Sequence, residues 1–351
     1  MMQERPGLSA SSQIRAKFLV EVHEPVHESM TIAGLLGAAV PIPPNVEPGG
    51  DGPTDEFLRG VVWNDDPEVL LFKDHRTDNY RLQTAWAWGA KYKLAENLGP
   101  SKKNLTGRSH FGDLQFLHAM AAKLDEEPKD TLAKVLLWAE VAYRLSIADG
   151  VSPTDRLDAI PVTSTVDNYS YQLSKFFDTT TEPTGSATIR TLLTRDTVYT
   201  NVDIRRRAIG SVLHLVQDSY ARGHTRRTLL NPQDLTGGRE EDQFKPGTWG
   251  RYGEVENFHY YGDQDKTLHA KYDVPPEGMV MRPTDVASFN PLVGARDSIT
   301  ATAELLTMWQ NQMPWDAPSG PKEYLEETVF KLSPKASRAD SEVLPPPRAQ
   351  Q

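Results

Sequence analysis

Residues 214–224, HLVQDSYARGH, gather three metal-competent side chains in one short stretch. His214 and Asp218 are four residues apart, so on an α-helix both side chains lie on one face and can reach a single ion. His224 lies roughly 280° around an ideal helix from His214, at ~100° per residue. His224 therefore points elsewhere unless the helix breaks at Gly223, and two directions of ligands indicate two ions rather than one.

Further segments of the chain carry matching residues. A lone histidine is more often an ordinary core or surface residue than a metal ligand. Five His and carboxylate elements in a chain with nine histidines are harder to explain in that way. Outside residues 214–224, the candidates are His23 and His27 in EVHEPVHE, Asp65 and Asp66 in WNDDP, His110 in RSHFGDL, and His269 and Asp273 in HAKYD.

One of these assignments has a close rival. His259 and Asp263 repeat the spacing of His269 and Asp273, so either pair can complete a second ion site. We prefer the second pair because of a likeness given below. The histidines interpreted as structural are His75 and His118.

The composition restricts the chemistry. The absence of cysteine excludes disulfides, thiol catalysis and thiolate zinc sites, so a transition metal must bind His and carboxylates. A net charge of -10 provides no general basic field for a polyanion. No apolar run reaches the ~18 residues of a membrane span. The first residues lack a signal-peptide core, so we expect a secreted or translocated protein without a recognisable signal peptide, or alternatively a cytoplasmic one.

The elements that hold these residues are predicted to be helices. Apolar residues at spacings of three and four predict helices, and no alternating strand pattern is present. We expect an all-α fold, with a single multi-helix domain over residues 1–332, long ordered loops around a metal cleft, and a disordered tail at 333–351. The predicted helices are 80–98, 113–122, 130–148, 166–177 (the weakest), 203–221 and 295–312, and the predicted loops are 41–54 and 228–265.

Together, these motifs resemble the superfamily of zinc-dependent phospholipases C and single-strand-specific nucleases, and more closely the bacterial zinc phospholipases C. The most specific match is His214-x3-Asp218-x5-His224 followed by HAKYD, which is closer to the family's segment than the rival pair. The matching residues are spread over 23–273. The resemblance implies an all-helical enzyme that binds three zinc ions in one cleft.

By position, the resemblance also implies which residues bind each ion. The family completes its third site with an N-terminal tryptophan, and no tryptophan precedes His27 here. Either His23 takes that place or only two ions bind tightly. The implied ligands are Asp65 (or Asp66), His110, His214 and a bridging Asp218 for the first ion, His224, His269 and Asp273 for the second, and His27 with Asp218 for the third.

The implied reaction is hydrolysis of a phosphodiester by a zinc-activated water. We expect Asp65 to orient or deprotonate that water, with Asp66 as the alternative. The substrate would be a glycerophospholipid met in transient contact with a membrane surface, giving diacylglycerol and a phosphorylated headgroup. The alternatives are a single-strand-specific zinc nuclease or 3'-nucleotidase, and a non-catalytic metal-binding helical protein. The acidic net charge weighs against the nuclease.

Overall fold

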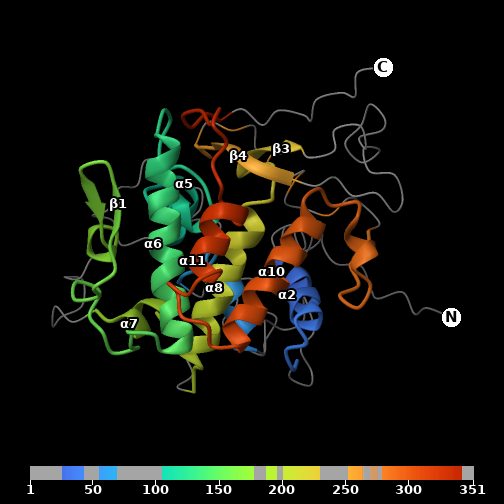
Figure 1. Cartoon of the computed structure of the whole chain (residues 1–351), viewed down its shortest axis with the longest axis horizontal. Coiled ribbons are helices and arrows are strands. Elements are labelled where there is room, and N and C mark those ends of the chain that lie inside the picture. The colour runs from blue at the N-terminus through green and yellow to red at the C-terminus, as the bar shows by residue number, and fades with distance from the viewer. Residues whose placement is uncertain are drawn as a thin grey trace, which may run out of the picture.

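Helix α8 (Ile204–Asp218) is central among the described helices of the computed structural model (Figure 1). The carboxylate of Asp203 accepts a hydrogen bond from the backbone N–H of Arg206 at 3.2 Å and so caps the helix. Most residues of α8 after the first turn are buried, so it needs neighbours on all sides. The structure describes residues 26–42, 55–68, 105–177, 187–195, 201–229, 252–262, 264, 269, 272, 275 and 279–341.

Helix α3 (Glu56–Trp63) packs against α8 at two glycines. A Cβ atom on Gly60 would lie 2.1 Å from the carbonyl oxygen of Arg207, and one on Gly210 would lie 2.2 Å from that of Phe57. The two backbones therefore approach more closely than any side chain would allow. This contact fixes the end of α3, and with it the WNDDP segment, against α8.

Three longer helices enclose this pair, and α2, α10, α8 and α6 are neighbours in Figure 1. Helix α6 (Pro128–Ile147) covers one side of α8, where the indole N–H of Trp138 donates to Ser211 at 2.9 Å. Helix α10 (Ala295–Gln310) lies on α8 and also on α2 (Val26–Gly37). A Cβ atom on Gly34 of α2 would lie 2.4 Å from the methyl group of Thr302.

Short elements link these helices. They include single helical turns and a five-residue π-helix, and they bring loops back onto the bundle. Their bounds are Leu105–Phe111 for α5, Gln115–His118 for η1, Leu173–Lys175 for η2, Ile189–Leu193 for α7, Val286–Phe289 for η5, Pro321–Tyr324 for α11 and Leu325–Val329 for η6.

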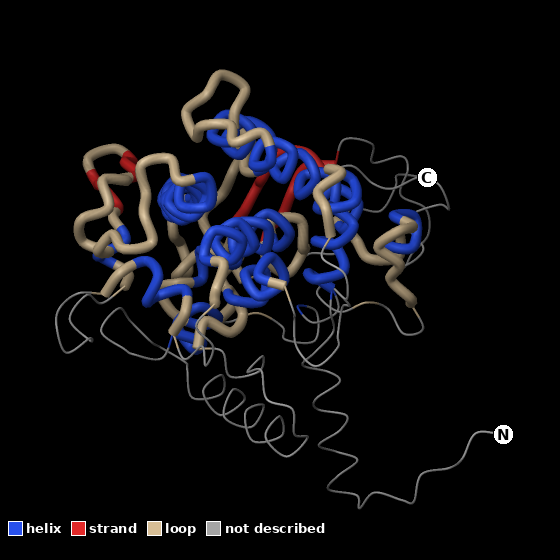
Figure 2. The backbone as a smooth tube through the Cα atoms, turned by 90° about the horizontal axis from the view of Figure 1, so that it is seen from below, coloured by secondary structure: helices blue, strands red, loops and turns tan. Residues whose placement is uncertain are grey.

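The fold is mostly helical, as expected, but the all-α prediction missed two small antiparallel sheets (Figure 2). Strands β1 (Ser164–Val166) and β2 (Tyr169–Tyr171) form a short hairpin, so the weak helix predicted for 166–177 is wrong. Strands β3 (Thr225–Leu229) and β4 (Tyr252–Phe258) pair across a longer connection. Strands β1 and β2 have only three residues each, and β3 and β4 are irregular in register, so neither sheet gives a regular alternation in the sequence.

The strongest helical periodicities predicted helices correctly. The predictions for 130–148, 203–221 and 295–312 correspond to α6, α8 and α10. The predicted helix at 113–122 contains only the four-residue η1, and helices α2 and α3 were not predicted at all. The helix expected at 80–98 lies outside the described residues, as do most of the two predicted loops, 41–54 and 228–265.

Residues 333–341 lie against the bundle, although we expected disorder from Ser333 onward. The backbone N–H of Ser333 donates to Val255, and that of Ala339 donates to Glu126, each at 2.9 Å. The carboxylate of Asp340 contacts His259 at 2.9 Å. Residues 333–341 contain few apolar side chains, and backbone hydrogen bonds to β4 help to hold them in place. Residues 342–351 lie outside the described part.

Within the described part of the chain, no helix combines the length and apolar character needed to cross a bilayer.

Replacing Gly210 by alanine tests the helix contact. A Cβ atom there meets backbone rather than a movable side chain, so we expect Gly210→Ala to lower the free energy of unfolding by about 3 kcal/mol. Chemical denaturation measures this change. The control is Gly37→Ala in α2, whose added Cβ would lie 3.2 Å from a methyl group, and it should lose far less. Equal losses in the two variants would show that the α3–α8 contact is not a special constraint.

Candidate metal centre

The carboxylate of Asp218, on the last turn of α8, lies among four imidazoles. Its Oδ2 atom is 2.8 Å from His118 Nδ1, 2.9 Å from His214 Nε2 and 3.4 Å from His224 Nδ1. Its Oδ1 atom is 3.2 Å from His27 Nε2. Both oxygens of one buried carboxylate thus face ring nitrogens, which is the arrangement that a carboxylate bridging two ions requires.

Three of these atoms have spacings that suit zinc. His118 Nδ1 and His214 Nε2 are 3.0 Å apart, and each is within 2.9 Å of Asp218 Oδ2. Ligand atoms ~2.0–2.1 Å from a tetrahedral zinc ion are ~3.3 Å apart, so a small widening of this triangle would accommodate the ion.

Asp65 faces the same cluster from the end of α3. Its Oδ1 atom is 3.7 Å from His110 Nε2 and 3.8 Å from His118 Nδ1, and its Oδ2 atom is 4.0 Å from His214 Nδ1. These separations are too long for hydrogen bonds and exceed the ~3.3 Å between two ligands of a tetrahedral zinc ion, so Asp65 would move closer on binding the same ion. The Nδ1 atom of His214 is buried without a hydrogen-bond partner among the described residues, and an ion between it and Asp65 would supply one.

The other ring nitrogen of several histidines is held by an oxygen atom. His118 Nε2 is 3.1 Å from the carbonyl of Asn64, and His110 Nδ1 is 2.8 Å from that of Thr106. His27 Nδ1 is 2.9 Å from the side-chain oxygen of Gln217. A ring N–H donated to oxygen fixes the ring and directs the second nitrogen, as lone-pair donor, to the centre.

The described residues contain three overlapping groups that could each hold an ion. Within each group, one ligand atom from every residue lies within 4.8 Å of the others. Asp65 and His118 each belong to two groups, and Asp218 belongs to one. Asp65 has two oxygens that adjacent ions could share, whereas His118, with its Nε2 atom held by Asn64, has one nitrogen for one ion. The groups are His27, Asp65 and His214; Asp65, His110 and His118; and His118, Asp218 and His224.

His118 lies in the cluster, where sequence reasoning did not place it. We expected it to be structural, yet its ring lies between Asp65 and Asp218. The chain turns between α5 and η1, where Arg108 pairs with both carboxylate oxygens of Asp113 at 2.8 and 2.7 Å. This turn brings His118 to 5.0 Å from the His110 ring. The sequence does show His118 shortly after His110, but this spacing did not predict the turn that brings the two rings together.

His224 also differs from expectation. Helix α8 ends at Asp218, five residues before the expected break at Gly223, so the chain turns and His224 returns to the same carboxylate. His269 lies beside His224, with ring centroids 5.0 Å apart, and its Nδ1 atom is 2.7 Å from Gln264. It belongs to none of the three groups found among the described residues.

The remaining candidates divide clearly. His259 of the rival pair contacts Asp340 at 2.9 Å and is in no group of the described residues. Asp66 is 2 % exposed and likewise outside the described groups, whereas the Asp65 side chain is 39 % exposed and lies in two of them. His23, Asp273, Asp263 and His75 lie outside the described residues.

The electrostatics of the cluster favour the metal-binding form of both carboxylates and of His118, whereas Asp218 and Asp65 raise the pKa of His214 against the effect of burial. Burial alone would raise the pKa of Asp218, but the neighbouring His214, His224 and His27 outweigh it and hold this pKa well below the usual range. The pKa of Asp65 is likewise lowered, against the effect of burial, by nearby histidines. Burial lowers the pKa of His118 to about 4. Ionised carboxylates and a neutral imidazole are the states that bind a metal ion.

Comparisons of this chain with models of known protein families, with characterised proteins and with solved structures gave no match. The case for a metal centre therefore rests on the residues and their geometry.

The first test of the centre is its metal content. We expect at least two zinc ions per chain after mild dialysis, and chelation should lower the melting temperature because bound ions relieve the crowded site. Asp218→Asn should lose most of this zinc, since the bridging charge serves more than one ion. Elemental analysis measures the zinc content of the parent protein and of the variant. The control is Asp158→Asn, in an exposed ion pair with Arg156, and it should keep full zinc content. Full zinc in Asp218→Asn would refute the bridging assignment.

Glu28, next to His27 in α2, gives a test by pH. Burial raises its pKa to about 7 from an ordinary 4.5. Because the pKa of Glu28 is higher in the folded than in the unfolded state, the protein is most stable with respect to this group below pH 4.5. The free energy of unfolding then falls as the pH rises through 7. Zinc-free Glu28→Gln should therefore gain stability over the parent by roughly 3 kcal/mol at pH 8 and little at pH 4.5. Exposed Glu304→Gln is the control. Denaturation curves at the two pH values that show equal gains would contradict the expectation.

Proposed function

We propose that this chain is a zinc-dependent phosphodiesterase of the phospholipase C type. The observation that carries the proposal is the shared carboxylate of Asp218, with His27 on one oxygen and three imidazoles on the other. A centre for several ions, opposite a second carboxylate, suits phosphoryl chemistry, where charge develops on several oxygens at once. The substrate is a glycerophospholipid, and the products are diacylglycerol and a phosphorylated headgroup.

When bound, zinc would activate water for attack and offset charge on the phosphoryl oxygens. Asp65 is the carboxylate best placed to act on that water. Its side chain is 39 % exposed, whereas that of Asp218 is 2 % exposed, so solvent and substrate reach Asp65 first. Because nearby histidines lower its pKa, Asp65 stays ionised at neutral pH and is suited to accepting a hydrogen bond that orients the water.

The buried histidines complete the proposal. His214 and His118 are inaccessible to substrate and serve to hold the centre, not to contact the phosphodiester. His27 and His110 are partly exposed at its edge, with side chains 22 % and 14 % exposed. Phosphodiester binding over this edge would bring the phosphoryl group to Asp65 without opening the core.

Asp65→Asn tests the assigned role. Asparagine retains an oxygen that can contact an ion weakly but loses the charge that orients water, so turnover should fall by roughly 10²–10⁴-fold while much of the zinc is retained. Asp66→Asn is the matched control and should change turnover much less. The measurements are phosphocholine release from phosphatidylcholine and zinc content, both at saturating zinc. A near-normal Asp65→Asn beside an inactive Asp66→Asn would transfer the role to Asp66.

The same assay separates the competing functions. Release of acid-soluble product from single-stranded DNA, with no release of phosphocholine, would favour the nuclease. Zinc binding with no turnover of either substrate would favour a non-catalytic metal-binding protein.

A further inference from the structure

Asn64, the residue at which α3 ends, is completely buried next to the candidate metal centre. Its Nδ2 atom donates hydrogen bonds to the backbone carbonyl of Leu117 at 2.6 Å and to that of Ser211 at 3.2 Å. Its Oδ1 atom accepts a hydrogen bond from the Ser211 hydroxyl at 2.5 Å. One side-chain amide therefore joins the end of α3 to η1 and to α8.

Each of the three joined residues lies a short distance before a candidate metal ligand in the sequence. The side chains of these ligands converge, with His118 Nδ1 3.8 Å from Asp65 Oδ1 and 3.0 Å from His214 Nε2. The amide thus fixes, relative to one another, the three backbone segments that supply these atoms. The joined residues and the ligands that follow them are Asn64 and Asp65, Leu117 and His118, and Ser211 and His214.

The backbone of Asn64 also acts on one ligand directly. Its carbonyl lies 3.1 Å from His118 Nε2. A carbonyl oxygen can only accept, so Nε2 carries the proton and Nδ1 keeps the lone pair that a metal ion needs. Carbonyls in the last turn of a helix have no partner within the helix, which makes this one available. Asn64 therefore sets the tautomer of His118 as well as its position.

The hydroxyl of Ser211 fixes the orientation of the amide. The indole N–H of Trp138 donates to Ser211 Oγ at 2.9 Å, so the hydroxyl proton of Ser211 is directed to Asn64 Oδ1. The nitrogen of the amide then faces the two carbonyl oxygens. A flipped amide would place oxygen against oxygen, so only one orientation satisfies the buried groups. This residue is consequently held rigidly.

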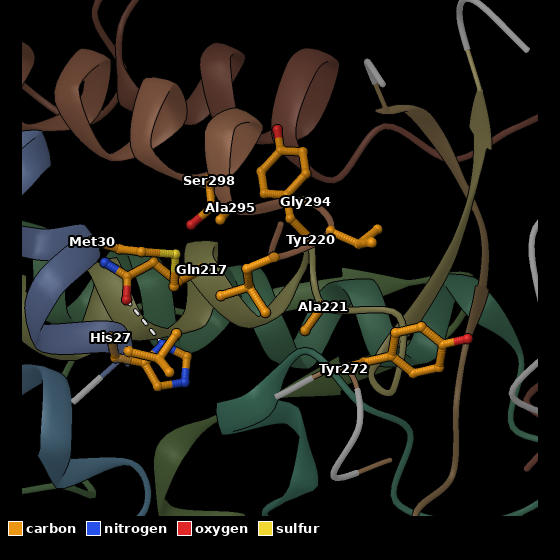
Figure 3. Close-up of a pocket in the computed structure, with 12 residues that line it drawn as sticks. His27, Met30, Gln217, Tyr220, Ala221, Tyr272, Gly294, Ala295 and Ser298 are labelled. Carbon is orange, nitrogen blue, oxygen red and sulfur yellow. Dashed lines mark hydrogen bonds between the residues drawn. The ribbon is translucent and has the colours of Figure 1, made fainter. Parts of the chain in front are cut away.

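The buried amide of Gln217 acts on the centre in a different way. Its Oε1 atom lies 2.9 Å from His27 Nδ1, a contact that Figure 3 shows, and its Nε2 atom donates to Thr31 at 2.8 Å. Gln217 thus holds one ring between α8 and α2. Asn64 instead holds the backbone of several ligands, so its loss would displace more than one of them.

We infer that Asn64 is a positioning residue of the metal centre. It holds the backbones that carry Asp65, His118 and His214 at the separations from which their side chains reach the same ions. Metal binding requires ligand positions accurate to about 0.2 Å, and backbone segments from three separate elements need a common support to meet that limit. The inference rests on the metal centre of the proposed function but not on the choice of substrate.

The test uses the full chain with Zn²⁺ or Co²⁺ as the only added ligand. Asn64→Ala should weaken zinc affinity by roughly 10–100-fold, the usual effect of losing a group that orients metal ligands. Competition with a chromogenic chelator measures this affinity. The visible absorption of bound Co²⁺ reports its coordination geometry, and it should change in Asn64→Ala because the ligands no longer keep their separations.

Asn257→Ala is the matched control. Asn257 is equally buried, and its Nδ2 atom donates to the carbonyl of Arg338 at 2.6 Å and to Ser337 Oγ at 3.0 Å. Both asparagine variants should lower the melting temperature of the metal-free protein. Only Asn64→Ala should lose zinc affinity, whereas Asn257→Ala should stay within about twofold of the parent protein because its amide bonds to none of the segments that carry these ligands.

Ser211→Ala is a milder variant, and it carries the test if Asn64→Ala fails to fold. It removes the hydroxyl that orients the amide but leaves both carbonyl acceptors in place. Zinc affinity should fall about threefold to tenfold, the effect of one net hydrogen bond.

The outcomes separate the inference from the proposed function. Unchanged zinc affinity and Co²⁺ absorption in a folded Asn64→Ala, or in Ser211→Ala where only that variant folds, would overturn the inference. Equal losses of affinity in Asn257→Ala would also overturn it, since they would reflect stability alone. A parent protein that binds neither ion would overturn the inference and the proposed function together. The expected losses in a protein that hydrolyses no phosphodiester would support the inference and overturn only the proposed function.

Discussion

The buried charge of Asp218 is the constraint around which the described part of this fold is arranged. Removing a carboxylate from water costs several kcal/mol unless partners compensate it. Here the compensation comes from imidazoles on α2, η1, α8 and the turn after α8, all directed at the same two oxygens. Hydrogen bonds from neutral rings offset only part of this charge, so the cluster can hold a metal ion. Four separate elements thus place imidazoles around one buried negative charge, which metal ions can neutralise.

The second carboxylate is placed by backbone contact instead. Asp65 follows α3 directly, and the glycines Gly60 and Gly210 bring the backbones of α3 and α8 together. Metal centres require ligand positions accurate to about 0.2 Å, and side chains at a helix interface would leave more freedom than that. A backbone-to-backbone contact has no rotamers to adjust. The glycine contact between α3 and α8 therefore helps to position a candidate metal ligand, although the glycines themselves cannot bind an ion.

Sequence reasoning predicted the parts of this arrangement that depend on local spacing. The helical repeat places His214 and Asp218 on one face of α8, and the long periodic stretches of α6 and α10 were equally recognisable. Helix α2 was missed because its residues are buried almost all round and give little periodicity. Helix α3 was missed because it has only eight residues.

The position of His118 could not be predicted for a different reason. It depends on a turn held by Arg108 and Asp113, a contact with no local signature in the sequence. Asp65 and Asp66 are adjacent in sequence and equal in chemistry, and only burial separates them. Spacing thus identifies which residues share an element, while tertiary packing decides which of them share an ion.

The residues of the candidate metal centre are unevenly buried, and this limits the side from which a substrate could reach them. His118, His214 and His224 are enclosed, whereas the side chains of His110, His27 and Asp65 are 14 %, 22 % and 39 % exposed. Under the proposed function, a phosphodiester would therefore meet the centre at its more exposed residues, Asp65 first, while the enclosed histidines would hold the ions without contacting it.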